Sequence, residues 1–168
     1  MEENEIHGVA HMKKNLISAC SSNPAYGIAV LAMLLGGLLY LLCRPACTRV
    51  TGWIQDTGFW SMLRVIRESL APVCVTFPAW VLYSLPDGLW SFAYAVIMSQ
   101  LWRGRSGLIS RLWLSTIPMV GIGFELSQLL AVIPGTFTWL DLFFSSVGMV
   151  LGLKMRLQAP LRNARIFR

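Results

Sequence analysis

Long apolar stretches alternate with short polar or basic ones from about residue 26 to the end of the chain. A membrane-spanning helix needs about 20 mostly apolar residues. A shorter stretch can span where the bilayer thins or where flanking residues reach the interface. On this basis the pattern predicts five membrane-spanning helices, at 26–43, 69–85, 89–102, 112–133 and 139–153.

The segment 53–68 has a different pattern. Apolar residues recur at helical spacing from Phe59 to Leu70, while Arg64, Arg67 and Glu68 fall on the opposite side. Aromatic residues on one face and charged residues on the other are typical of a helix lying in the membrane interface. The predicted fold class is therefore all-α integral membrane: a bundle of about five transmembrane helices plus one interfacial amphipathic helix.

The composition supports this class. Of the 168 residues, 55% are hydrophobic and 13% are charged, and the mean hydropathy is +0.60. Soluble domains carry about 25% charged residues. The net charge of +6 comes from basic residues at the ends of apolar stretches, so it indicates topology rather than nucleic-acid binding. The expected partner is the lipid bilayer, and no nucleic acid is expected.

The basic residues also predict an orientation, because cytoplasmic loops of membrane proteins are enriched in Lys and Arg. They place segments 44–67, 103–111 and 154–168 inside, and the segments 86–88 and 134–138, which lack basic residues, outside. The expected topology is N-out/C-in. It has a polar tail outside (1–25) and a basic cytoplasmic tail (154–168), and only Lys13 and Lys14 disagree with it.

The cysteines and histidines suggest little chemistry. Cys20, Cys43, Cys47 and Cys74 form no C-x-x-C pair and are too few in any one place for a metal site, so free thiols are expected. His7 and His11 have the i, i+4 spacing of a weak metal pair, but they lie in a polar tail, where coincidence explains the spacing equally simply.

Four polar residues stand out within the apolar segments: Asp87, Glu125, Gln128 and Asp141. A charged group at the centre of a bilayer costs at least ~2.5–3.5 kcal/mol, so such residues commonly mark functional sites. Asp87 is expected to act as an N-cap in a turn at 86–88, and Asp141 to open the last span. Glu125 is expected mid-helix, about 13 Å below the outer end of its span, with Gln128 one turn nearer the surface on the same side.

The expected topology gathers these residues in the outer half of the membrane. No basic residue occurs in 69–102 or 112–153, so the spans that form the cluster offer no positive partner. Its carboxyl groups must then be protonated, share a proton, bind a cation or interact with helix N-termini. A purely structural role for these residues stays open. Asp87 would then serve only as a helix cap, and Glu125 with Gln128 would make polar contacts between helices.

This pattern resembles the VanZ-like membrane family. The family hallmark is Glu-x-x-Gln closing one span, then a short outer loop and an Asp that is followed by two glycines. Glu125-Leu-Ser-Gln128 matches the first part, and Asp141 with Gly148 and Gly152 matches the second. An upstream family element, Asp-Lys-x-x-His-Phe, is similar to the segment from Asp87 to Phe92.

The chain departs from that pattern at several positions, and the resemblance covers only 86–153. Where the family pattern has Lys and His in its upstream element, this chain has Gly88 and Ser91. The family's loop Arg corresponds to a position near Gly135, and the acidic residue that follows it corresponds to Thr138. The family's Asn corresponds to Ser145. The resemblance implies a divergent member that has lost the cationic half of the site. It also implies a bacterial inner-membrane location and, for some members, a link to glycopeptide (teicoplanin) resistance.

Two kinds of function follow as hypotheses. In the first, an outward-facing acidic pocket binds or acts on a cell-envelope molecule, a lipid or a peptidoglycan-related compound. Glu125 would be its proton acceptor or cation ligand, and Gln128 would orient Glu125. Asp87 and Asp141 would hold a metal or a basic group. Proton or cation passage is a variant of the same idea. In the second, the chain is a non-enzymatic assembly protein that binds other membrane proteins. The stripe of Ser145, Gly148 and Gly152 is expected to serve close helix packing. Catalysis, metal and cofactor stay unassigned, because the sequence contains no nucleophile–base pair or metal motif.

Overall fold

The computed structural model describes residues 24–45, 49–133 and 135–158, and the regular structure within these ranges is entirely α-helical. The all-α prediction is confirmed. The helices are α2 (Pro24–Cys43), α3 (Arg49–Gln55), α4 (Phe59–Cys74), α5 (Ala79–Tyr83), α6 (Leu85–Leu101), α7 (Leu108–Gly121), α8 (Gly123–Leu129) and α9 (Trp139–Gln158).

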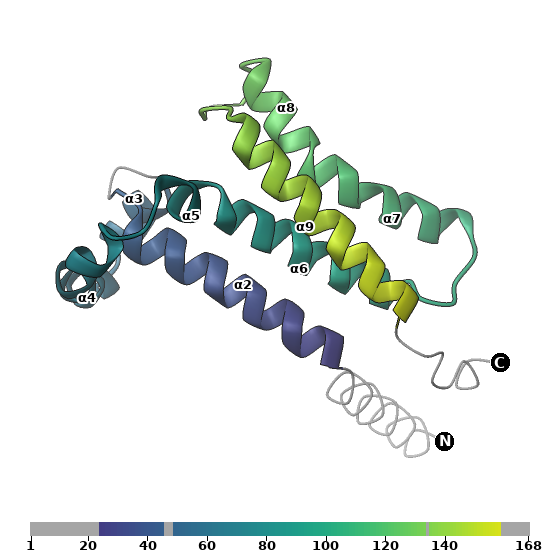
Figure 1. Ribbon diagram of the computed structural model, residues 1–168, viewed down its shortest axis with the longest axis horizontal. Coiled ribbons are helices and arrows are strands. Elements are labelled where there is room, and N and C mark those ends of the chain that lie inside the picture. Colours follow the sequence, from purple (N-terminus) through teal and green to yellow (C-terminus); the bar gives the residue numbers. More distant parts are fainter. Residues whose placement is uncertain (1–23, 46–48, 134, 159–168) are drawn as a thin grey trace, which may run out of the picture.

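Helix α6 lies in the middle of the bundle, with its most extensive contacts to α9 on one side and α2 on another (Figure 1). Helix α7 packs against α6 and α9, and α8 follows directly from it. The short helices α3 and α5 and the longer α4 gather near the C-terminal end of α2 (Figure 1). This end of α2 therefore lies beside the start of α6, and the two helices run in opposite directions.

Small residues make the contact surfaces of this bundle. The buried apolar cluster consists of Ala25, Ala29 and Ala32 from α2 with Ala93 and Val96 from α6. Large apolar side chains point outward instead, on α2, α7, α8 and α9 alike; Leu31, Leu34 and Phe143 are each 59% exposed. Close approach of the helix backbones, rather than burial of large side chains, holds α2, α6 and α9 together.

The expected five-span bundle is not borne out by the helices themselves. Among the described helices, α2 is the one that is long and apolar enough to cross a membrane, and α7 is a shorter apolar helix. Helix α6 begins four residues earlier than the expected span at 89–102, and α9 continues past 153 to Gln158. The expected span at 112–133 is divided into α7 and α8 by a break at Ile122.

The expected span at 69–85 is wrong. Helix α4 ends at Cys74, and only the five residues of α5 are helical before α6 begins. Pro78 is the physical reason, because proline has no N–H to donate and disfavours helical geometry in the residue before it. Its backbone is extended, with ψ 149°. The helix is thus interrupted at residues 75–78.

The expected interfacial helix at 53–68 is found as two helices. A turn at 56–58, in which the Thr57 hydroxyl donates to the Ile54 carbonyl at 2.6 Å, separates α3 from α4. Helix α4 is amphipathic as expected: Leu63 is buried, while Arg64 and Glu68 form an exposed ion pair at 2.8 Å on the other face. The polar N-terminal tail to residue 23, the His7–His11 pair, Cys20, Cys47 and the tail from 159 lie outside the described residues.

Candidate functional site

Three carboxyl groups from three helices meet at one end of the bundle. Asp87, Glu125 and Asp141 each offer an oxygen atom, and these atoms all lie within 4.8 Å of one another. Each residue occupies the first turn of its helix, respectively α6, α8 and α9. Glu125 is only 4% exposed and Asp141 8% exposed. Three of the four polar residues singled out in the sequence are therefore brought together.

The sequence predicted that Asp87 is an N-cap, and this prediction is wrong. The N-cap of α6 is Ser84, and residues 86–88 belong to the first turn of the helix rather than to a tight turn before it. Proline is favoured at this point because its missing N–H would be unpaired in the first helical turn anyway. Pro86 thus allows α6 to start early, and the Asp87 side chain is free to point into the carboxyl cluster.

Thr138 fixes the start of α9. Its hydroxyl accepts a hydrogen bond from the Asp141 N–H at 3.1 Å, which is the N-cap interaction typical of threonine. The Phe137 and Trp139 rings pack edge to face beside it, with their centroids 5.0 Å apart. Since the cap sets where the helix begins, it also sets the direction of the Asp141 side chain two residues into α9.

Glu125 does not lie mid-helix. The α7 helix ends at Gly121, and α8 starts at Gly123, so Glu125 falls in a first turn. Pro118 within α7 removes one backbone donor, and glycines at 121 and 123 on either side of Ile122 lower the helix propensity at the break. The prediction failed because a long apolar run looks continuous in sequence even where such residues interrupt it.

Arg44 supplies a positive charge that the sequence analysis missed. Its Nη2 atom lies 3.5 Å from Asp87 Oδ2, and its guanidinium donates to the Leu82 carbonyl at 3.2 Å and to the Tyr83 carbonyl. The guanidinium also lies over the Tyr40 ring, 4.6 Å from its centroid. The spans expected to form the cluster carry no basic residue themselves, and the basic neighbour of the cluster comes instead from the residue after α2. The contact also brings Arg44 and Asp87, which were expected on opposite sides of the membrane, to the same end of the bundle.

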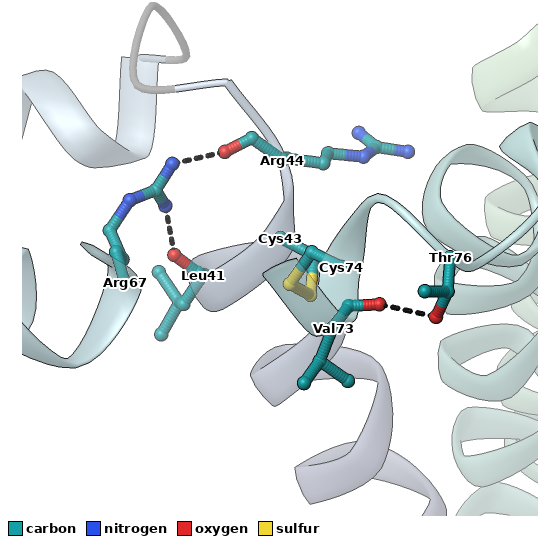
Figure 2. The surroundings of a disulfide bond; sticks show 7 residues. All are labelled: Leu41, Cys43, Arg44, Arg67, Val73, Cys74 and Thr76. Atoms are coloured by element: carbon teal, nitrogen blue, oxygen red, sulfur yellow. Dashed lines mark hydrogen bonds between the residues drawn. A yellow bond between two sulfur atoms is a disulfide. The ribbon is translucent and has the colours of Figure 1, made fainter. Parts of the chain in front are cut away.

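A disulfide and a second arginine hold Arg44 in place (Figure 2). Cys43, the last residue of α2, is bonded to Cys74, the last residue of α4. Arg67 of α4 donates hydrogen bonds to the Leu41 and Arg44 carbonyls, which satisfies acceptors at the end of α2. The expectation of free thiols at Cys43 and Cys74 is wrong, because sequence spacing cannot show a pairing made by folding.

Gln128 does not join the cluster. Its side chain lies against the outer loop, so a Cβ atom added at Gly135 would fall 2.6 Å from its Cδ atom. The Glu125 Oε2 atom, which Gln128 was expected to orient, is buried and has no hydrogen-bond partner in the part of the chain that the structure describes. Ser145 lies one turn beyond Asp141 on α9 and is buried.

The glycine stripe on α9 packs against α6. A Cβ at Gly148 would overlap the Gly88 carbonyl, and one at Gly152 would lie 2.7 Å from both the Ala95 Cβ and the Phe92 carbonyl oxygen. Gly88 is equally confined, with the Phe144 carbonyl oxygen 2.9 Å from a Cβ placed there. The stripe therefore serves close packing, as expected, and this packing brings Asp141 beside Asp87.

The site contains two carboxyl oxygen atoms without a hydrogen-bond partner in residues 24–45, 49–133 and 135–158. Glu125 Oε2 and Asp141 Oδ1 are both buried and make no hydrogen bond within the described ranges. Buried acceptors and charges of this kind are costly unless a cation or proton satisfies them. The arrangement can bind a cation, bind the basic part of a larger ligand, or hold a shared proton, and Arg44 can contact an acidic part of the same ligand.

Comparison with known proteins adds no family to this description. No family model, curated protein or solved structure matches the chain.

Proposed function

We propose that this chain is a VanZ-like bacterial inner-membrane protein whose acidic site faces outward and binds the polar part of a cell-envelope lipid or peptidoglycan-related molecule. One observation carries the proposal: carboxyl groups from three helices converge with Arg44 at the same end of the bundle. An isolated ionisable residue at a helix end has many explanations. Three carboxyl groups in mutual reach, two of them buried with unsatisfied oxygens and the third in contact with Arg44, are typical of a binding site.

The distribution of side-chain sizes supports a membrane location. Helices associate in lipid through small residues that allow close backbone approach, and their large apolar side chains face the acyl chains. Here alanines and glycines lie between α2, α6 and α9, while leucines and phenylalanines lie outside. A water-soluble monomer rarely exposes so large an apolar surface.

We further propose four crossing segments, formed by α2, α6, α7 with α8, and α9, with both termini in the cytoplasm. The Arg44–Asp87 contact supports this topology, because it requires the end of α2 and the start of α6 to share one membrane side. The N-terminal Lys13 and Lys14 then lie inside with Arg103, in agreement with the enrichment of basic residues in cytoplasmic loops. The Cys43–Cys74 disulfide falls on the outer, oxidising side.

In this topology α3, α4 and α5 do not cross the membrane. They lie on its outer side, where the amphipathic α4 suits the interface between lipid and water. The four basic residues of this part are then exceptions to the charge rule: Arg44, Arg49, Arg64 and Arg67. Three of them are engaged with protein groups: Arg44 with Asp87, Arg64 with Glu68, and Arg67 with the carbonyls that end α2.

Arg44 takes the place of the cationic residues that the VanZ-like pattern carries at positions 88 and 91. Gly88 has no room for a side chain, because the Phe144 backbone lies against it. The chain thus combines the carboxyl groups of the family pattern with a guanidinium from a different helix. A site with both signs of charge suits a zwitterionic or amino-containing head group.

A lipid ligand is favoured over a soluble one by an apolar hollow next to the site. Its volume is about 170 Å³, and it is lined by α2 from Leu35 to Cys43 and by Leu70, Val73 and Phe77. Since Cys43 lines the hollow and the adjacent Arg44 contacts Asp87, an acyl chain and its head group could occupy the two places together.

The test identifies the lipids that remain bound to the protein during purification. The full chain is purified from bacterial membranes in mild detergent, and retained molecules are identified by native mass spectrometry and lipid extraction. We expect one class of polar envelope lipid at about one molecule per chain, and its loss from the Glu125→Gln and Asp141→Asn variants. Glu68→Gln, which removes an exposed carboxylate on α4, is the matched control. Equal retention by all four proteins, or no retained lipid in any, contradicts the proposal.

A further inference from the structure

We infer that Asp87, Glu125 and Asp141 form a binding site for a divalent cation of the size of Ca²⁺. This inference deepens the function proposed above, because it concerns the same site and names an ion that would be present when the polar ligand binds. Ca²⁺ prefers oxygen ligands, chiefly carboxylates, and completes its coordination with water and carbonyl oxygens.

The spacing of the carboxyl groups suits this ion. Ca²⁺ binds oxygen at 2.3–2.6 Å, so two oxygen atoms on one ion lie at most about 5 Å apart. One oxygen from each of the three residues lies within 4.8 Å of the others, which is inside that limit for every pair. Mg²⁺ binds at 2.0–2.1 Å and limits the separation to about 4.2 Å. Ca²⁺ therefore fits the whole of this range of separations and Mg²⁺ only its shorter part, so we expect the site to prefer Ca²⁺.

Two buried oxygen atoms of the cluster have no hydrogen-bond partner in the described part of the chain. Glu125 and Asp141 are both more than nine-tenths buried. Their Oε2 and Oδ1 atoms are inaccessible to water, and neither atom has a hydrogen-bond partner among the described residues. Leaving such acceptors unsatisfied costs about 1–3 kcal/mol each, and more when they are charged. A cation bound between them satisfies both at once.

The charge of the site also matches a divalent ion. Three ionised carboxylates and one guanidinium leave a formal charge of −2, which one divalent cation neutralises. Arg44 contacts the Oδ2 atom of Asp87 and is anchored by the Leu82 and Tyr83 carbonyls and by the Tyr40 ring. It therefore stays on one edge of the site, and the Glu125 and Asp141 oxygens remain available.

The experiment measures Ca²⁺ binding to the purified full chain in detergent micelles after removal of metal by a chelator. Isothermal titration with CaCl₂ is expected to show one ion per chain, with a dissociation constant of about 10⁻⁴–10⁻³ M or tighter, the range of extracellular calcium modules. MgCl₂ is expected to bind at least tenfold more weakly. Ca²⁺ should also raise the thermal unfolding midpoint, because an ion that binds only the folded protein stabilises it.

Variants then locate the ion. Glu125→Gln and Asp141→Asn are expected to weaken Ca²⁺ binding at least tenfold, while Glu68→Gln binds like the wild type. If the variants fold poorly, the wild-type comparison of Ca²⁺ with Mg²⁺ still decides the question. The inference is overturned if the wild type binds no Ca²⁺ at concentrations up to about 10 mM, above which only non-specific binding is expected. It is also overturned if all variants bind Ca²⁺ as tightly as the wild type does. No lipid is added in this experiment. A failure to bind Ca²⁺ would therefore overturn the cation site without deciding whether the protein retains an envelope lipid.

Discussion

Loss of the Cys43–Cys74 disulfide should destabilise the protein and release Arg44 from the acidic site. The bond joins the ends of α2 and α4, so it holds the residue after Cys43 beside Asp87. The perturbation is Cys43→Ser with Cys74→Ser. It is made in a background of Cys20→Ser and Cys47→Ser, so that the reference protein contains only the bonded pair.

The size of the effect follows from the loop that the bond closes. The two cysteines are 31 residues apart in sequence. The chain-entropy relation gives about 3.7 kcal/mol at 25 °C for a flexible loop of that length. If the 16 residues of α4 stay helical in the unfolded state, the flexible part falls to about half, and the relation gives about 3 kcal/mol. We therefore expect a loss of about 3–4 kcal/mol.

Two assays check this prediction. Thiol labelling of the two-cysteine protein under denaturing conditions should show no free thiol until a reductant is added. Reversible unfolding in detergent, followed by circular dichroism, should show the stability loss in the serine variant. Free thiols in the protein isolated from cells, or a change below about 1 kcal/mol, would refute the reasoning and with it the position of Arg44.

Two further predictions concern packing and topology. Gly148→Ala should destabilise the protein by about 1–3 kcal/mol in the same unfolding assay, since the new Cβ overlaps the Gly88 carbonyl. Gly37→Ala is the control, because nothing lies within 4 Å of its new Cβ, and it should be neutral or stabilising by up to about 1 kcal/mol. A topology reporter fused after Asp56 should be active outside the cytoplasm; cytoplasmic activity there would instead support the five-span, N-out arrangement.

The helical class and the convergence of the acidic residues follow from sequence, although the local positions expected for Asp87 and Glu125 were wrong. Apolar runs of 14 to 20 residues leave few alternatives to helices. Asp87, Glu125 and Asp141 each lie close to a polar loop or a helix break, so their convergence depends only on which loops share an end of the bundle. The packing role of Gly148 and Gly152 follows similarly, since small residues one turn apart mark a close helix contact.

Arg44 and the disulfide could not be found in this way. A charge rule assigns every basic residue after a span to the cytoplasm, and it has no means of detecting an arginine paired with Asp87. With Arg44 assigned to the cytoplasm, the rule directs α2 from outside to inside and requires an additional span at 69–85, whereas the topology proposed here has the opposite direction for α2 and no span there. The sequence did hold two signals against that span: Pro78 in its middle, and Cys74 at the distance from Cys43 that a helical hairpin could close.

The most direct test of the account is a double-mutant cycle between Arg44 and Asp87. Arg44→Gln, Asp87→Asn and the double variant are compared with the wild type by reversible unfolding in detergent. The two groups lie 3.5 Å apart and are largely shielded from water, so a coupling energy of about 1–3 kcal/mol is expected. Additive effects within about 0.5 kcal/mol would mean that the two residues do not meet, and would contradict both the site and the proposed topology.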